Sequence, residues 1–168
     1  PRARAITSSD KGFSVIVDNE FDWQGDNFVM PPKHDQVIYE LHVGTFNRPD
    51  AATSGTFDSA IEKLDYLKEL GVEVLWITPM YKSPQNDNGY DISDYYDIDP
   101  NYGTMADFEE MLAEAHKRGL KIVMDIVVNH SSTENKWFKK SEAGDSKYKD
   151  FYIWKDAVDG KEPTNWQS

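Results

Sequence analysis

The chain has 168 residues, and its 30 Asp and Glu against 18 Lys and Arg give a formal net charge of −12. This acidic balance argues against a nucleic-acid partner, because phosphate binding needs clustered Lys and Arg. The absence of cysteine excludes a disulfide scaffold, a thiolate zinc site and a cysteine nucleophile. No apolar run approaches the ~18–20 residues of a membrane span. With no signal-like segment visible either, we expect a cytoplasmic protein without a membrane partner.

Residues 1–35 are expected to form an approach segment or the end of a preceding domain. Residues 14–17, Ser-Val-Ile-Val, are predicted to form one short strand. Residues 18–35 are rich in Asp, Asn and Gly and include a Pro-Pro pair, which is a loop composition.

A strand is predicted over residues 37–43 and a helix over residues 57–70. The apolar residues of the helical stretch recur every three or four positions, as on one face of a helix; they are Phe57, Ile61, Leu64, Leu67 and Leu70. Thr56 is a plausible N-cap, and Gly71 stands where a left-handed residue ends a helix.

The second strand is predicted over residues 72–78 and is followed by a long polar loop over residues 81–103. Thr104 and Asp107 then have the spacing of a capping box. The helix behind them is predicted to bury one apolar face and to end at Gly119; the buried residues are Phe108, Met111, Leu112 and Ala115. A third, almost continuously apolar strand is predicted over residues 121–128.

Alternation of strands and helices predicts an α/β fold with a parallel sheet that is buried on both faces. Binding sites in such folds lie at the carboxyl ends of the strands, on the loops that follow them. Here those loops are residues 44–56, residues 79–103 and the segment from residue 129 onward.

Asp125 is the one charged side chain inside the third apolar strand, and Asn129 and His130 follow where that strand ends. An isolated buried carboxylate is costly, so Asp125 must be paired or hydrogen-bonded. A structural Asp and a site residue are equally compatible with this pattern. A single His is more often structural than catalytic, but the position of His130 favours a function.

Residues 87–91, Asp-Asn-Gly-Tyr-Asp, lie on the loop after the second strand. They have the composition of a solvated turn. They also suit a carbohydrate site, because a Tyr ring stacks on a sugar while carboxylates and His bond its hydroxyls.

Two further clusters are interpreted as structural. Four acidic residues form a possible cation site but lack the glycine of an EF-hand loop, so we expect them to be solvated; they are Asp91, Asp94, Asp97 and Asp99. Aromatic residues recur beyond residue 131, where a small core is preferred to a sugar platform; they are Trp137, Phe138, Phe151, Tyr152, Trp154 and Trp166.

Several stretches of the sequence resemble the alpha-amylase superfamily, glycoside hydrolase family 13. Residues 125–130, Asp-Ile-Val-Val-Asn-His, resemble its first conserved region. Residues 87–91 with Ser-Asp-Tyr at 93–95 resemble the loop after its second barrel strand. The start of the inserted domain B of oligo-1,6-glucosidases and related alpha-glucosidases is similar to residues 137–138, 148–154 and 162–166. The resemblance covers roughly residues 36–168, and its motifs occur in the family's order.

The resemblance implies the N-terminal portion of a (β/α)8 TIM barrel, with about three strands and two helices in residues 36–130. Residues 131–168 would be the start of domain B. Asp87, Tyr90 and His130 would bind the sugar that is cleaved, while Asp125 and Asn129 would support the site. The expected substrate is an alpha-linked glucose oligosaccharide or polysaccharide.

The resemblance also implies a retaining mechanism with an Asp nucleophile and a Glu acid/base. Retention needs two carboxyl groups about 5–5.5 Å apart, and in the family they follow the fourth and fifth strands, beyond Ser168. We therefore expect no catalytic residue in this chain and no activity from it alone. The remainder of the barrel, or a complementing chain, would be its partner. The alternative is a non-catalytic, glucosidase-like binding or assembly module.

One stretch departs from the oligo-1,6-glucosidase pattern, which has a calcium-binding loop after the first strand. Residues 37–57 look more like branching, debranching and trehalohydrolase enzymes, with a change of resemblance near Leu70. The first loop therefore gives no support for calcium, and we expect neither a metal nor another cofactor.

Overall fold

In the computed structural model, the described residues are 22, 29, 32–161, 163 and 164. Contacts between Cα atoms divide the chain into one unit of Pro1–Lys33 and another of His34–Ser168. The strand predicted over residues 14–17 lies outside the described residues, as does most of the expected approach segment. A short 3-10 helix, η1 (Lys33–Asp35), lies at the boundary between the two units.

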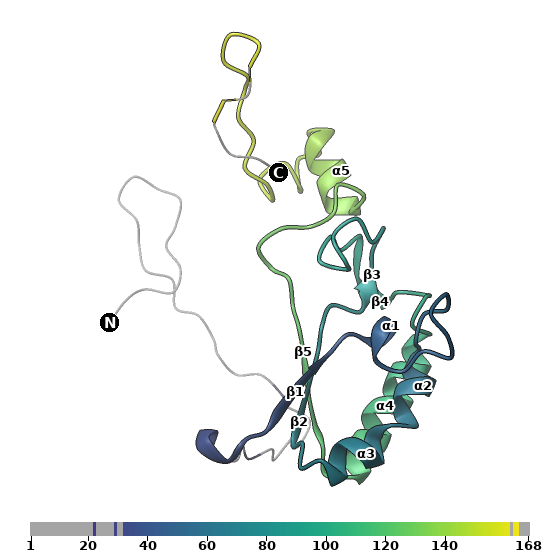
Figure 1. The fold of residues 1–168 in the computed structure, drawn as a ribbon. Helices are drawn as coiled ribbons and strands as arrows, with labels where there is room; N and C mark the ends of the chain where they lie inside the picture. The colour runs from purple at the N-terminus through teal and green to yellow at the C-terminus, as the bar shows by residue number, and fades with distance from the viewer. Residues whose placement is uncertain (1–21, 23–28, 30–31, 162, 165–168) are drawn as a thin grey trace. The chain divides into compact units, whose positions relative to one another are not determined.

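A three-stranded parallel sheet forms the centre of the second unit (Figure 1). Its strands are β1 (Ile38–Leu41), β2 (Val74–Ile77) and β5 (Lys121–Met124), in the order β1-β2-β5. The last residues of the strands, Leu41, Ile77 and Met124, are aligned across the sheet. The predicted parallel α/β arrangement is therefore confirmed.

The first strand is shorter than predicted, because the chain turns into a helix directly after it. The carbonyl of His42 accepts hydrogen bonds from the amides of Thr45 and Phe46, each at 3.0 Å, and α1 (Val43–Phe46) results. Val43 is buried, but in a helical rather than an extended backbone. The apolar sequence correctly predicted that Val43 is buried, but it did not predict the helical backbone at this residue.

The helix predicted over residues 57–70 is interrupted and forms α2 (Phe57–Ile61) and α3 (Leu64–Glu69). Asn47 Nδ2 donates to the carbonyl of Ser59 at 2.6 Å. The amide of Lys63 therefore donates to the carbonyl of Ala60, one residue closer than the α-helical acceptor. A side chain inserted into the hydrogen-bond ladder is a known cause of a helix break.

The predicted caps of these helices are confirmed. Thr56 caps α2, and Ser59 completes a capping box. Thr104 and Asp107 form the predicted box at the start of α4 (Met105–Lys117). The glycines after α3 and α4 have φ angles of 89° and 72°; they are Gly71 and Gly119.

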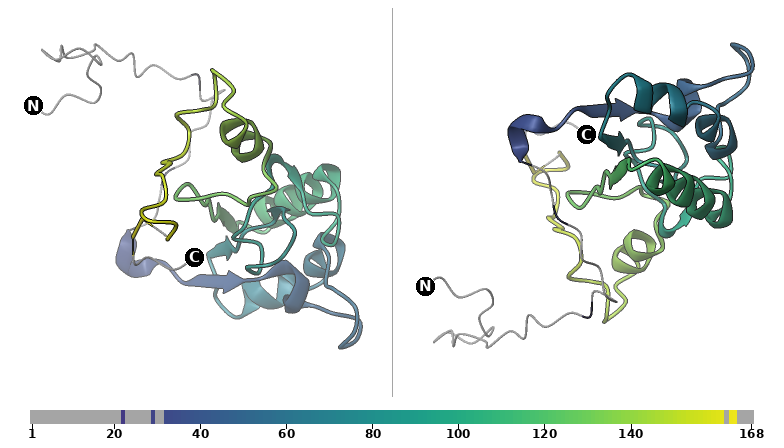
Figure 2. Two further views of the ribbon diagram at one scale, coloured as in Figure 1. Left: turned by 90° about the horizontal axis from the view of Figure 1, so that it is seen from above. Right: turned by 90° about the horizontal axis from the view of Figure 1, so that it is seen from below.

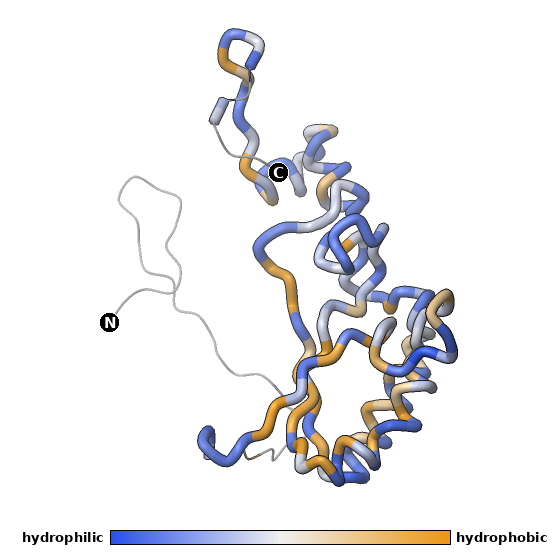
Figure 3. The backbone as a smooth tube through the Cα atoms, viewed as in Figure 1, coloured by the Kyte–Doolittle hydropathy of each residue, from blue (hydrophilic) through white to orange (hydrophobic). Residues whose placement is uncertain are grey.

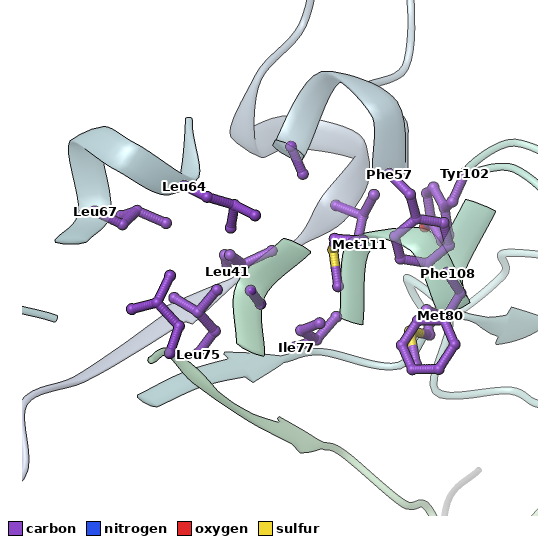
Figure 4. Close-up of a cluster of buried hydrophobic side chains, with 14 of the residues drawn as sticks. Leu41, Phe57, Leu64, Leu67, Leu75, Ile77, Met80, Tyr102, Phe108 and Met111 are labelled. Carbon is purple, nitrogen blue, oxygen red and sulfur yellow. The ribbon is translucent and has the colours of Figure 1, made fainter. Parts of the chain in front are cut away.

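The helices cover one face of the sheet (Figures 1 and 2) and enclose the main core between themselves and the strands. Leu64 and Leu67 of α3 lie beside Leu41 and Leu75 of the strands (Figure 4). The helix α4 contributes three buried residues, Phe108, Met111 and Ala115. Three predicted core residues lie differently: Ile61 and Leu112 are half-buried, and Leu70 is 57% exposed at the end of α3.

The opposite face of the sheet is exposed and carries apolar side chains beside Glu40, contrary to the prediction of burial on both faces. Trp76 and Val123, which are aligned in neighbouring strands, are 39% and 37% exposed. The apolar run continues past β5 (Figure 3). In this run, Ile126 and Val128 are 63% and 82% exposed. Burial on both faces requires a layer on each side, and the described helices supply only one.

The polar stretch predicted as a loop over residues 81–103 contains a small antiparallel sheet. Its strands are β3 (Tyr81–Lys82) and β4 (Asp94–Ile98). A second apolar cluster of Tyr81, Ile92 and Val127 lies beside it. The irregular segment after residue 130 likewise contains an unpredicted helix, α5 (Lys136–Glu142), which is too short to show a sequence period. Among the described residues, no helix is long and apolar enough to cross a membrane.

Candidate sugar-binding site

The two motif-bearing loops leave the sheet at the same edge. Residues 79–103 follow β2, and residues 125–130 follow β5, whose partner is β2. The amide of Asp125 donates to the carbonyl of Ile77 at 3.0 Å, so the ladder extends one residue beyond β5. This places Asp125 at the carboxyl end of the sheet, where parallel α/β folds bind their ligands.

Tyr90 and Asp125 join the two loops directly. The Tyr90 hydroxyl donates to Asp125 Oδ2 at 3.1 Å, and both side chains are half-buried. Burial raises the pKa of Tyr90, and the hydrogen bond to Asp125 and the negative charges of Asp125, Glu40 and Asp87 raise it further. The phenol is therefore neutral at neutral pH and acts as the donor. Asp125 thus accepts a hydrogen bond from a tyrosine of the neighbouring loop.

Asp87 and Tyr90 occupy the two ends of one tight turn. The amide of Tyr90 donates to the carbonyl of Asp87 at 2.9 Å. Between them, Asn88 and Gly89 have φ angles of 51° and 94°. Two central residues with positive φ define a type I′ turn, and Asn-Gly is a preferred pair for it. The turn leaves Asp87 exposed and close to Tyr90, so the turn interpretation is confirmed, while the role of this segment in sugar binding stays a prediction.

The expectation that all the acidic residues between 91 and 99 are solvated is wrong. Asp99 is 1% exposed and accepts hydrogen bonds from Ser83 N, Gln85 Nε2 and Asn101. Asp91 is half-buried and likewise bonded within the loop. Their oxygens accept hydrogen bonds from amides and side chains of the same loop. Within the described part of the chain, no group of three His, Cys, Asp or Glu side chains is arranged to hold a metal ion.

Asn129 and His130 form a second pair at the same edge. Asn129 Nδ2 lies 3.1 Å from His130 Nδ1, and both residues are exposed. The Tyr95 hydroxyl lies 2.7 Å from the carbonyl of His130 and 2.8 Å from that of Val127, which anchors this segment to β4. The structure thus brings Tyr90 to Asp125 and Asn129 to His130. It records no hydrogen bond between the two pairs.

A cavity of about 580 Å³ opens beside His130 and is lined largely by aromatic rings. Trp137 stacks on Tyr95 with ring centroids 5.4 Å apart and planes 9° apart. The ring centroid of Phe138 lies 5.2 Å from that of Tyr152 and 5.4 Å from that of Trp154. These rings contact one another, but they do not form the small buried core that the sequence predicts: Phe151 and Trp154 are 53% and 48% exposed, and Trp137, Phe138 and Tyr152 are half-buried. Trp166 lies outside the described residues.

Sequence reasoning did not single out His42 and Tyr102, which lie at the carboxyl end of β1 and on the loop before α4. His42 Nε2 lies 3.1 Å from the Tyr102 hydroxyl, and the rings meet edge to face at 5.5 Å. Burial lowers the pKa of His42, although a backbone hydrogen bond partly opposes this. Both residues line a cavity of about 260 Å³. The available signal was a His near the carboxyl end of the strand predicted over residues 37–43.

Comparison with known proteins agrees with this geometry. A model of the alpha-amylase catalytic domain matches residues 40–168. The chain is 58% identical over 134 residues to the trehalose-6-phosphate hydrolase of Bacillus subtilis (strain 168), covering 79% of this chain and 24% of that protein. It is 53% identical to the oligo-1,6-glucosidase of Parageobacillus thermoglucosidasius, with the same coverage. The chain thus spans about a quarter of the length of these relatives.

Solved structures give the same result. The trehalose-6-phosphate hydrolase of Bacillus licheniformis matches with a TM-score of 0.74 and 57% identity, covering 80% of this chain and 24% of that chain. The trehalulose synthase of Pseudomonas mesoacidophila MX-45 matches with a TM-score of 0.75 and 47% identity, with the same coverage.

The similarity is not confined to the part after Leu70. A match of 134 residues exceeds the 98 residues that follow Leu70 (168 − 70), so it includes part of the stretch before that residue. The family match begins at residue 40, within β1, and includes both motif-bearing loops. Together with the parallel sheet and its covering helices, these matches show that the chain belongs to the alpha-amylase catalytic domain family and forms part of its (β/α)8 barrel.

Proposed function

We propose that this chain is part of a retaining alpha-glycosidase or transglycosidase that acts on alpha-glucosides, and that it supplies part of the sugar-binding subsite. The named relatives include trehalose-6-phosphate hydrolases and oligo-1,6-glucosidases, which are hydrolases of alpha-glucosides. The substrate of this protein would belong to the same class, as an alpha-linked glucose oligosaccharide or polysaccharide.

The hydrogen bond between Tyr90 and Asp125 is the observation that carries the proposal. It holds the ring of Tyr90 at the carboxyl edge of the sheet, in one orientation, between two loops. An aromatic face held in this way can stack on the apolar face of a glucose ring. The exposed carboxylate of Asp87, at the other end of the same turn, can accept hydrogen bonds from the sugar hydroxyls.

His130 completes the proposed subsite with Asn129 as its supporting residue. An amide that donates to Nδ1 leaves the proton of a neutral imidazole on Nε2. His130 would then donate from Nε2 to a sugar hydroxyl. Asp125 and Asn129 in this proposal contact other side chains and set their orientation.

No residue of this chain is assigned to bond cleavage. A retaining mechanism needs a nucleophilic carboxylate and an acid/base carboxyl group about 5–5.5 Å apart. We propose that both come from parts of the protein outside these 168 residues, and that residues 131–168 begin an inserted domain. The reaction needs no cofactor, and the proposal includes none.

The test uses the full-length gene product that contains these residues, together with the 168-residue chain. We expect the full-length protein to hydrolyse p-nitrophenyl alpha-glucoside and at least one of isomaltose and trehalose-6-phosphate. Proton NMR should show the alpha-anomer of glucose as the first product. The 168-residue chain, assayed with the same substrates, should release no product. Absence of both hydrolysis and glucosyl transfer by the full-length protein, or a first product with the beta configuration, would contradict the proposal.

A further inference from the structure

The loop that carries Asp87 and Tyr90 is closed on itself by a carboxylate outside the proposed sugar contacts. Asp91 Oδ1 accepts hydrogen bonds from Ser83 Oγ at 2.8 Å and from the amide of Asp87 at 3.0 Å. Its Oδ2 accepts from the amide of Asn86 at 3.0 Å. Ser83 Oγ in turn accepts from the amide of Gln85 at 2.9 Å. One carboxylate and one hydroxyl thus tie residues 83–91 together.

The conformation held by Asp91 includes two non-glycine residues in the left-handed region, which costs little for Asn88 in its type I′ turn and more for Gln85. Gln85 and Asn88, both inside the closed segment, have φ angles of 62° and 51°. Non-glycine residues reach the left-handed region at an energetic cost and remain there when surrounding contacts enforce it. The amides of Gln85, Asn86 and Asp87 are all bound by the Asp91–Ser83 pair. Loss of that pair therefore frees the segment to relax.

The effect of Asp91 reaches the proposed sugar residues through two successive hydrogen bonds. Asp91 holds the amide of Asp87, and the carbonyl of Asp87 accepts from the amide of Tyr90 at 2.9 Å. The far end is fixed by the bond from Tyr90 to Asp125. Both oxygens of Asp91 already have donors inside the loop, so its carboxylate acts on the backbone and not on a ligand.

We infer that Asp91 is a positioning residue for sugar binding, which holds Asp87 and Tyr90 in the orientation that receives the glucose unit. This inference rests on the proposed function. Ser83 supports Asp91 in this role, because its hydroxyl links the Asp91 carboxylate to the start of the loop. Hydrogen bonds to an ionised acceptor are about twice as strong as neutral ones, which suits a carboxylate to this task.

The chain offers a matched control in Asp50, on the loop after β1. Asp50 Oδ1 accepts from the amides of Ala52 and Thr53 at 2.8 and 2.9 Å, and Oδ2 accepts from Thr53 Oγ1 at 3.1 Å. It therefore receives two amides and one hydroxyl, as Asp91 does. Asp50→Asn removes an equivalent set of bonds from a loop that holds none of the proposed sugar residues.

The experiment compares Asp91→Asn with Asp50→Asn in the full-length gene product. With p-nitrophenyl alpha-glucoside as substrate, we expect Asp91→Asn to raise KM by about tenfold, the equivalent of one lost charge-assisted hydrogen bond. Asp50→Asn should leave KM within about twofold of the wild type, since it lies on a separate loop. A thermal melt on each variant verifies that both are folded at the assay temperature.

A second readout follows the ring of Tyr90 by NMR with carbon-13-labelled tyrosine, assigned with Tyr90→Phe. The hydrogen bond to Asp125 contributes to the raised pKa of Tyr90. If Asp91 positions the loop, Asp91→Asn should move the pKa of Tyr90 toward that of free tyrosine. Asp50→Asn should not. A purely structural loss of stability would leave the Tyr90 titration of the folded protein unchanged.

Equal KM values for Asp91→Asn and Asp50→Asn, or an unchanged Tyr90 titration in Asp91→Asn, would overturn the inference. If Asp91→Asn does not fold, Ser83→Ala replaces it, with a smaller rise in KM and the same direction of change at Tyr90 expected. No change from Ser83→Ala in either readout would also overturn it. Lack of hydrolysis by the wild type would instead remove the proposed function, while the Tyr90 titration would still decide whether Asp91 positions the loop.

Discussion

Replacement of Leu67 by alanine is expected to lower the free energy of unfolding by about 2–5 kcal/mol, the usual cost of this truncation in a core. Leu67 lies on α3, is 0% exposed and belongs to the main cluster between helices and sheet (Figure 4). Alanine removes its contacts with the sheet face and leaves a cavity that rigid neighbours do not fill. Urea denaturation followed by circular dichroism measures the change.

Leu70 provides the matched control, because it is the same residue type one helical turn later. It is 57% exposed, so Leu70→Ala should change the free energy of unfolding by no more than about 0.5 kcal/mol. Similar losses for the two variants would show that α3 does not pack on the sheet through the face described above. If the free energy of unfolding of the wild type is smaller than the expected loss, Leu67→Ala will already be unfolded without urea, while Leu70→Ala remains folded.

Gly89→Ala is expected to cost about 2–5 kcal/mol, because two independent penalties combine at this position. Gly89 has a φ angle of 94°, which disfavours any residue with a Cβ atom. A Cβ atom there would also meet the carbonyl oxygen of Pro79 at 2.9 Å. Because the turn must move away from Pro79, the variant should also bind p-nitrophenyl alpha-glucoside more weakly.

Gly71→Ala separates the two penalties. Gly71 has a φ angle of 89°, but a Cβ atom there would have nothing within 4 Å. The free energy of unfolding of this variant should therefore fall only by the conformational cost of about 1–2 kcal/mol, and its sugar affinity should be unchanged. Denaturation curves of both variants, with KM values in the full-length protein, provide the comparison. If Gly89→Ala lowers the free energy of unfolding no more than Gly71→Ala does, the close approach of Gly89 to Pro79 is refuted.

The parts of the fold that were predictable depend on neighbours in the sequence. The capping residues Thr56 and Thr104 bond within their own first turn, and Gly71 and Gly119 end the helices locally. The helical face of Phe108, Met111 and Ala115 has the spacing of a single buried stripe. Such signals need no knowledge of the rest of the chain, and each was readable from the sequence.

The parts that could not be predicted depend on contacts from a distance. The break between α2 and α3 results from Asn47, a residue 12 positions away from the carbonyl that it occupies. The hairpin within residues 81–103 was hidden because Asp residues disfavour strands. Here Asp91 and Asp99 bind amides of the same loop.

The candidate site divides in the same way. The turn from Asp87 to Tyr90 was readable from its Asn-Gly pair, whereas its attachment to Asp125, 35 residues after Tyr90, required the fold. The identity of the donor to Asp125 was not predictable, because Arg, loop amides and a tyrosine satisfy a carboxylate equally well. The roles of Asp87, Tyr90 and His130 in sugar binding remain predictions.

The order of the strands has a consequence for biosynthesis. In the sheet β1-β2-β5, each strand pairs with the one made immediately before it, apart from the small hairpin of β3 and β4. During translation, β2 can dock on β1 once it has itself left the ribosome behind α2 and α3, and β5 can dock on β2 once it has emerged behind α4. The order of pairing within this sheet is therefore the order of synthesis, and β5, the last of the three strands to be made, lies at one edge of the sheet.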